Sequence, residues 1–244
     1  MKHVRQDYLL INFVVSRDVN AAIDYVFDNN VLADSTNSFS GISGGSYSEQ
    51  KARALFDGFK TQDETGQEIM DQDGIESFMT QIGVDAQADI VVVVISQYMA
   101  AEYMGEYKWS EFNKGCKALN CDSIASWKTI TSKLRQEVQN DAKFAEMYKF
   151  AFGFAKEKDK RNVDCELACA LWDLLIGSKC QFLTQWKAFV MGKKERGEQL
   201  VVTRDTWDLF YDLIKQTNGN IANFVDDGAW PSMIDQFVES LNGQ

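Results

Sequence analysis

The segment most informative about the fold reads Phe224-Val-Asp-Asp-Gly-Ala-Trp230-Pro231-Ser-Met-Ile-Asp235-Gln-Phe-Val-Glu239 and contains the only proline of 244 residues. Proline is well tolerated in the first turn of a helix, where its missing N–H would have had no partner. The apolar residues around and behind it recur at helical spacing: Trp230, Ile234, Phe237, Val238 and Leu241. The sequence therefore predicts a turn that brings Trp230 into a core, followed by an amphipathic C-terminal helix.

Upstream of this helix, the chain from Lys51 onward reads as one helix after another. Leucines and alanines of the segment 166–176 form one apolar stripe. Thr203 can cap the next helix, with Asp205 in its first turn, where an acid suits the helix dipole. The valine-rich segment 89–96 favours a strand by composition, but a helix-forming segment follows it and no partner strand is evident. We therefore predict a buried helix there and an all-α fold.

Composition limits the classes of function. Hydrophobic residues at 45% and aromatic residues at 12% suffice for a substantial core, and the six tryptophans, all beyond residue 100, predict its centre in the C-terminal part. The formal charge of −11 argues against nucleic-acid binding and favours a basic protein partner. No apolar run approaches the roughly 20 residues that span a bilayer. A signal peptide is also missing, so we expect a cytoplasmic or nuclear protein without membrane contact.

The sequence contains few side chains suited to enzymatic catalysis. The single histidine, His3, lies near the N-terminus, so hydrolases with a histidine base and histidine-built metal centres are not expected. Glycine-rich phosphate loops are absent as well. The five cysteines predict reduced, buried thiols, and a thiol enzyme using Cys165 or Cys169 would need a lowered pKa and exposure. We expect a binding protein without cofactor or metal.

A calcium sensor or adaptor is the alternative function. The stretches Thr61–Gly74 and Lys156–Asp164 suggest helix–loop–helix units. A calcium loop with Gly66 as sixth residue would have Thr61 first and Gln72 twelfth, without the required carboxylates. The second stretch carries lysines where ligands should be, which would repel a cation.

The chain divides into a short unit and a long one. Residues 41–50 lie in a run rich in glycine and serine and predict a linker. The unit before it, residues 1–40, resembles a compact three-helix ubiquitin-associated-type module, and a helical extension packed on the main domain is the alternative. Residues 51–244 would form the main helical domain.

Six segments, in order, resemble the defective-in-cullin-neddylation family over roughly residues 50–240. They are Leu119–Ile124, Phe144–Ala155, Ala170–Leu175, Phe182–Trp186, Arg204–Leu209 and Gly228–Glu239. The resemblance implies a potentiating-neddylation domain of EF-hand-like helix pairs that bind no calcium. It also implies a non-catalytic co-ligase, which holds a cullin and a modifier-conjugating enzyme together so that a ubiquitin-like modifier reaches a cullin lysine. The N-terminal module would bind ubiquitin or that modifier.

The resemblance implies two sites. The cullin's C-terminal winged-helix region would dock on Asp205, Ala229 and Asp235, two carboxylates beside a small residue that suit a partner's lysine or arginine. The structural alternative is that Asp205 complements a helix dipole and Asp235 is a solvated acid.

The second implied site is an apolar pocket for the acetylated N-terminus of the conjugating enzyme. Its residues would be Ile75, Ile95, Met104, Tyr107, Phe154, Leu171 and Leu174. Acetylation removes a charge that would be costly to bury. This chain departs from the family at Met104, where relatives offer a glutamine that can hydrogen-bond the peptide.

Overall fold

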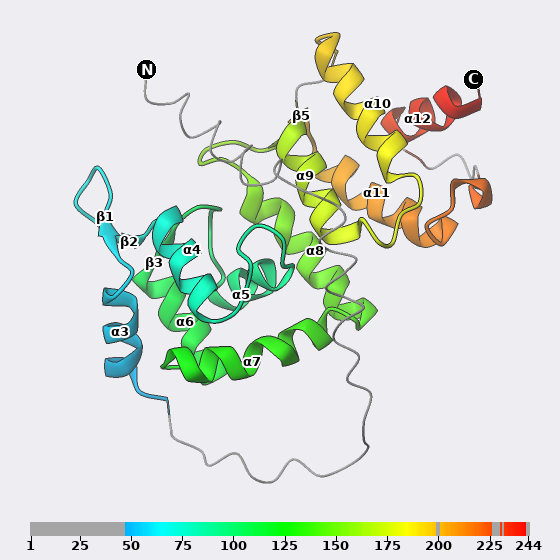
Figure 1. Cartoon of the computed structure of the whole chain (residues 1–244). Coiled ribbons are helices and arrows are strands. Elements are labelled where there is room, and N and C mark those ends of the chain that lie inside the picture. Colours follow the sequence, from blue (N-terminus) through cyan, green and yellow to red (C-terminus); the bar gives the residue numbers. More distant parts are fainter. Residues whose placement is uncertain (1–46, 199–200, 226–229, 231, 243–244) are drawn as a thin grey trace, which may run out of the picture.

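The computed structural model describes residues 47–198, 201–225, 230 and 232–242. Two groups of helices lie side by side, and the long helix α8, the first element of the second group, lies along the first group (Figure 1). The predicted N-terminal module, residues 1–40, lies outside the described residues. None of the described helices is both long and apolar enough to cross a membrane.

The first group combines helices with a small antiparallel sheet. Its elements are α3 (Glu49–Asp57), β1 (Thr61–Gln62), β2 (Glu68–Met70), α4 (Gln72–Gln81), α5 (Val91–Met99), β3 (Tyr107–Lys108), α6 (Trp109–Leu119) and α7 (Ile124–Glu137). Strand β2 is central, with Ile69 opposite both Thr61 and Lys108. The sheet thereby joins the loop between α3 and α4 to the loop between α5 and α6.

The second group repeats this plan. Its elements are α8 (Asp141–Ala155), β4 (Val163–Asp164), α9 (Cys165–Ile176), α10 (Leu183–Glu195), β5 (Val201–Val202), α11 (Arg204–Thr217), the short 3₁₀ helix η1 (Ile221–Asn223) and α12 (Ser232–Asn242). Strands β4 and β5 are antiparallel, with Val163 opposite Val202. The described residues are thus mostly helical, as predicted. The short strands were not predicted from the sequence.

The valine-rich segment forms a helix, which confirms the prediction made against its β-branched composition. Helix α5 packs against α6, α7 and α8, so its valines are buried on several sides at once. Tertiary burial outweighs the small intrinsic preference of valine for strands. The helix ends where Ala100 adopts a left-handed conformation with φ of 50°.

Side-chain caps fix two helix starts. The Thr203 side chain accepts a hydrogen bond from the Thr206 N–H and places Asp205 in the first turn of α11, as predicted. At the other end of the chain, Ser48 caps α3 by accepting from the Lys51 N–H. Helix α3 therefore begins at Glu49, inside the range predicted as linker.

Aromatic side chains fill both halves of the core. Phe78 packs between Phe112 and Trp127 in the first group, with ring centroids 5.4 and 5.5 Å away. Trp172 and Trp186 are fully buried in the second. Most of the buried core residues lie beyond residue 100, as the tryptophans predicted, and phenylalanines upstream of residue 100 extend the core toward the N-terminus.

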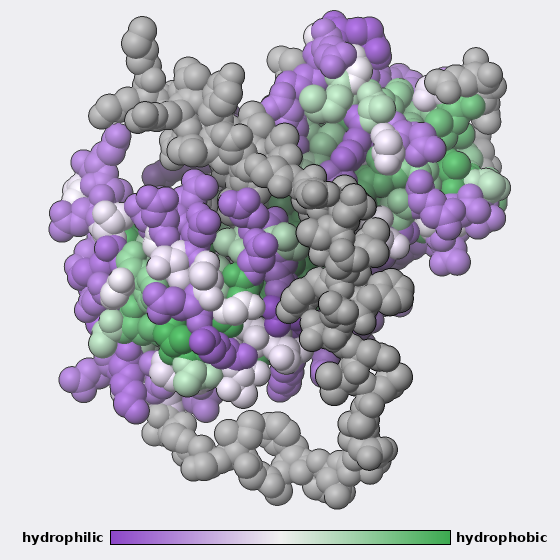
Figure 2. Space-filling view, viewed as in Figure 1, coloured by the Kyte–Doolittle hydropathy of each residue, from purple (hydrophilic) through white to green (hydrophobic). Residues whose placement is uncertain are grey.

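The C-terminal helix α12 has its predicted apolar stripe, with Ile234 and Phe237 fully buried. Trp230 lies only at the edge of the core. Its ring packs on Phe224 at 5.9 Å, and its indole N–H donates to the carbonyl of the exposed Val225. Trp230 and Phe224 are both partly buried against the core, so the tryptophan reaches the core at its edge and is not inserted as deeply as predicted. Hydrophobic patches interrupt the hydrophilic surface over α10 to α12 in Figure 2.

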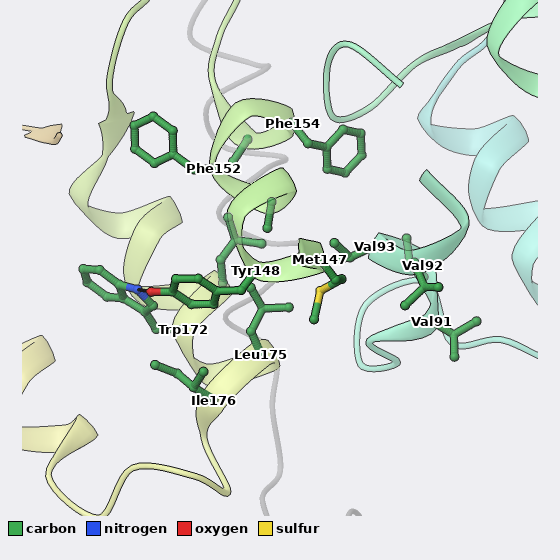
Figure 3. Packing of buried hydrophobic residues seen from close by; sticks show 14 of the residues in the cluster. Val91, Val92, Val93, Met147, Tyr148, Phe152, Phe154, Trp172, Leu175 and Ile176 are labelled. Carbon is green, nitrogen blue, oxygen red and sulfur yellow. Dashed lines mark hydrogen bonds between the residues drawn. The ribbon is translucent and has the colours of Figure 1, made fainter. Parts of the chain in front are cut away.

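A buried hydrogen-bond network connects α8, α9 and α11. The Trp172 indole N–H donates to the Tyr148 hydroxyl at 2.9 Å (Figure 3). That hydroxyl donates to the Trp207 carbonyl at 3.0 Å. The Trp207 indole N–H in turn donates to the Tyr148 carbonyl at 3.0 Å. These bonds fix how the three helices lie relative to one another.

Candidate functional site

An apolar cavity lies where the two groups of helices meet, between α4, α5, the α5–β3 loop, α8 and α9. All the predicted pocket residues except Ile95 line it: Ile75, Met104, Tyr107, Phe154, Leu171 and Leu174. They are separated by up to about a hundred positions in the sequence, so only tertiary packing brings them together. Figure 3 shows Phe154 on α8 together with Val92 and Val93 on α5.

Helix α4 is held close to the preceding loop. The Asp71 side chain caps it by accepting from the Gly74 N–H at 3.0 Å. A Cβ atom at Gly74 would lie 2.3 Å from the Phe59 carbonyl oxygen, so glycine is required there. This close approach positions Ile75 in the cavity wall.

Tyr107 presents its ring, and not its hydroxyl, to the cavity. The Ser96 hydroxyl donates to the Val92 carbonyl at 2.8 Å, so the Tyr107 hydroxyl donates to Ser96 at 2.6 Å. Burial raises the pKa of Tyr107 well above its ordinary value. The phenol therefore stays neutral, and its hydrogen-bonding capacity is used inside the protein.

Two sets of backbone contacts fix the loop that carries Met104. The Met104 N–H donates to the Phe154 carbonyl at the end of α8, at 2.9 Å. The buried Glu111 carboxylate accepts from the Glu102 N–H and the Lys108 N–H, each at 2.8 Å. Met104 thus closes one side of the cavity from a loop that is tied at both ends.

Ile95 is completely buried but is absent from the cavity wall. Val92 and Val93, three and two residues earlier in α5, occupy the wall instead. Sequence reasoning missed these two valines because every residue from Val91 to Ile95 is buried, so the apolar pattern does not distinguish wall from core. Ala86 and Gln87, in the loop before α5, were also missed.

The two predicted acids lie in the first turns of neighbouring helices. Asp205 is exposed on α11, Asp235 is partly buried on α12, and these helices pack against each other. Neither acid forms an ion pair within the described residues; Arg204 beside them pairs with Asp208 at 2.8 Å. Ala229, the third predicted residue, lies outside the described part of the chain.

The cysteines differ from reactive thiols. All five are described and buried, and none forms a disulfide. Burial raises the pKa of Cys165 to about 11 and that of Cys169 to about 12, so both stay protonated at neutral pH. A catalytic thiol would need the opposite shift. The described residues contain no group of three or more metal-binding side chains.

Known proteins resemble this chain over most of its length. A family model described as "Cullin binding" matches residues 125–240, which include both acids and the cavity residues of α8 and α9. Defective in cullin neddylation protein 1 of Caenorhabditis elegans is 30% identical over 250 residues, 94% of this chain and 82% of that protein. DCN1-like protein 4 of Drosophila melanogaster is 32% identical over 198 residues, 81% of this chain and 77% of that protein. DCN1-like protein 5 of Homo sapiens is 28% identical over 193 residues, with 79% and 78% covered. A chain with these relatives, and with the helical architecture described above, belongs to the defective-in-cullin-neddylation (DCN1-like) family.

Proposed function

We propose that this protein is a non-catalytic co-ligase that promotes neddylation of cullins. The observation that carries the proposal is the pair Asp205 and Asp235, which start two packed helices inside the segment that matches the cullin-binding model. Carboxylates without an internal ion pair are suited to lysine or arginine side chains of a partner. The cullin's C-terminal winged-helix region is the proposed partner.

The second proposed partner is the modifier-conjugating enzyme, held by its acetylated N-terminus in the apolar cavity. Because the Tyr107 hydroxyl is occupied by Ser96, the inner wall offers mainly hydrocarbon to a ligand. A free amino group buried there would lose several kcal/mol of hydration without a partner. An acetylated methionine avoids that cost.

The physical contribution to the reaction is proximity. Helices α8 and α9 carry Phe154 and Leu171 of the cavity, and the Tyr148 network joins them to α11, which carries Asp205. A stiff connection between the two sites would hold both reactants at a fixed separation and raise their effective concentration. No side chain of this protein is then required to take part in the chemical step.

A charge-reversal experiment tests the cullin site. Asp205→Lys combined with Asp235→Lys should abolish capture of a cullin winged-helix fragment, while circular dichroism and thermal unfolding remain close to those of the unmodified protein. The matched control is Asp73→Lys with Glu64→Lys, which makes the same charge change and also removes a first-turn acid. Unchanged cullin capture by the first variant would refute the assignment.

A peptide titration tests the cavity. The N-terminal peptide of the conjugating enzyme should bind when acetylated and bind more weakly when its amino group is free. Equal affinity for both would retain the co-ligase role and move the peptide's end out of the cavity. No binding by either would remove the conjugating enzyme from the proposal.

Three further features belong to the same proposal. Residues 1–40 would form a ubiquitin-associated-like module, joined by a linker, that binds ubiquitin or the ubiquitin-like modifier. The helix pairs would be EF-hand-like units that bind no calcium, which is supported by the short strand pairs β2–β3 and β4–β5 between successive loops. The protein would act in the cytoplasm, the nucleus or both.

A further inference from the structure

We infer that an acidic segment near the N-terminus, residues 18–34, docks on a basic segment formed by residues 149–161. The basic segment comprises the last two turns of α8 and the loop that follows it. The inference goes beyond the proposed function and does not depend on it. It assigns a contact within the chain to exposed side chains that neither proposed site uses.

The basic segment has a charge opposite to that of the whole chain. It carries five basic side chains and two acidic ones, in a protein whose formal charge is −11. The basic residues are Lys149, Lys156, Lys158, Lys160 and Arg161, all exposed except the partly buried Lys156. None of the five forms an ion pair within the described residues. Their charge is therefore available to a segment from outside that part of the chain.

The loop holds several of these charges in a tight turn at the surface. The Lys160 N–H donates to the Glu157 carbonyl at 3.1 Å, and Asp159 adopts a left-handed conformation with φ of 65°. The carboxylates of Glu157 and Asp159 offset only part of the positive charge, because the basic side chains of the segment outnumber them. An excess of positive charge remains on an exposed surface.

Lys158 lies near two acids that are already engaged. The pKa of Glu102 is lowered mainly by its hydrogen bond with Lys108, and Lys158 contributes to that shift. The pKa of Asp63 is lowered mainly by the hydrogen bond from Thr65, and Lys158 again contributes. Because both carboxylates have other partners inside the protein, Lys158 can still accommodate an additional carboxylate.

The acidic segment complements this surface in charge. It contains Asp18, Asp24, Asp28 and Asp34, and neither lysine nor arginine occurs from residue 18 to residue 50. A nucleic acid or an anionic membrane would be repelled by the acidic chain as a whole, whereas a short segment meets mainly the local charge. A segment of the same chain also has a high effective concentration, so a few exposed ion pairs suffice to hold it.

The chain is long enough to make this contact. The part that precedes α3 is fixed at Ser48, whose N–H donates to the Asp122 carboxylate at 3.0 Å. From there α3 covers about 14 Å, and the residues that follow it up to Asp63 add at most about 20 Å. Lys158 lies within electrostatic reach of Asp63. Residues 35–46 span about 40 Å when extended, so the acidic segment can reach Lys158.

Zero-length cross-linking of the full chain tests the inference. A carbodiimide joins a lysine to a carboxylate only where the two are in contact, and the monomer fraction of dilute protein would be digested and mapped by mass spectrometry. Cross-links from the acidic segment to lysines of the basic segment should be about three- to tenfold more abundant than those to Lys114 and Lys128. These two control lysines are exposed on α6 and α7. Most of the excess should disappear in about 0.5 M sodium chloride.

A charge swap separates attraction from simple accessibility. Asp24→Lys with Asp28→Lys should lower the yield of the remaining cross-links between the two segments about three- to tenfold. Adding Lys158→Glu and Lys160→Glu should restore cross-linking, with lysine and carboxylate exchanged between the segments. Circular dichroism should show the same helix content in every variant. Equal cross-linking to the basic segment and to the control lysines would overturn the inference, as would cross-links found only in dimers.

Discussion

Removal of one buried hydroxyl should show how much the hydrogen bonds between α8, α9 and α11 contribute to the free energy of unfolding, separately from the aromatic packing around them. Tyr148→Phe keeps the ring, which stacks on Trp207 at 4.8 Å and on Tyr211 at 4.7 Å. It deletes the oxygen that accepts from the Trp172 indole N–H and donates to the Trp207 carbonyl. The change is therefore confined to two hydrogen bonds in a site without solvent access.

The expected loss of stability follows from the two groups that lose their hydrogen-bond partner, the Trp172 N–H and the Trp207 carbonyl. The Trp172 N–H loses its acceptor in the core, and a buried unsatisfied donor costs about 1–3 kcal/mol. The Trp207 carbonyl lies inside α11 and keeps its helical partner, so its loss is smaller, about 0.5 kcal/mol. The sum is about 1.5–3.5 kcal/mol, or about 3–14 °C in Tm for a domain of this size.

Urea unfolding followed by tryptophan fluorescence and by circular dichroism measures this difference. Tyr211→Phe is the matched control, because Tyr211 is almost equally buried and its ring stacks on that of Tyr148, but its hydroxyl has no hydrogen bond within the described residues. That control should change the free energy of unfolding by less than about 0.5 kcal/mol. Equal effects of the two substitutions would refute the argument that the Tyr148 hydroxyl secures these helices.

Three other predictions concern packing, the cavity and pH. Gly115→Ala should destabilise the protein by about 1–3 kcal/mol, because its Cβ would lie 2.5 Å from the Met99 Cγ where α5 and α6 cross. Gly153→Ala, in α8 with nothing within 4 Å of its Cβ, should instead stabilise it by up to about 1 kcal/mol, and denaturation midpoints distinguish the two. Met104→Gln should strengthen binding of the acetylated peptide by about 0.5–1.5 kcal/mol in calorimetry, by supplying a hydrogen bond at the cavity; unchanged affinity would place the peptide backbone elsewhere. Burial raises the pKa of Cys116 to about 12 and that of Cys121 to about 11, whereas unfolded thiols ionise near about 8.5. The unfolded state therefore loses protons first, so the urea midpoint should fall as pH rises above about 8.5, and a constant midpoint up to about pH 10 would contradict this.

Local sequence was sufficient for the helices and their caps. The single proline and the stripe behind it predicted α12, and Thr203 predicted the start of α11 with Asp205 in its first turn. These features depend on residues within one or two turns of each other, so a linear pattern contains them. The helical state of the segment 91–99 could also be predicted, although only by weighing its neighbours against its valines.

The cavity was decided by tertiary structure. Its wall combines α4, α5, loop residues, α8 and α9. The choice of Val92 and Val93 over Ile95 depends on which side of α5, buried from Val91 to Ser96, meets the empty space. The position of Trp230 at the edge of the core, where its ring packs on the partly buried Phe224, was likewise set by tertiary packing. Hydrophobic periodicity reports that a side chain is buried, but only packing between distant segments determines whether it faces another side chain or a space that a partner can fill.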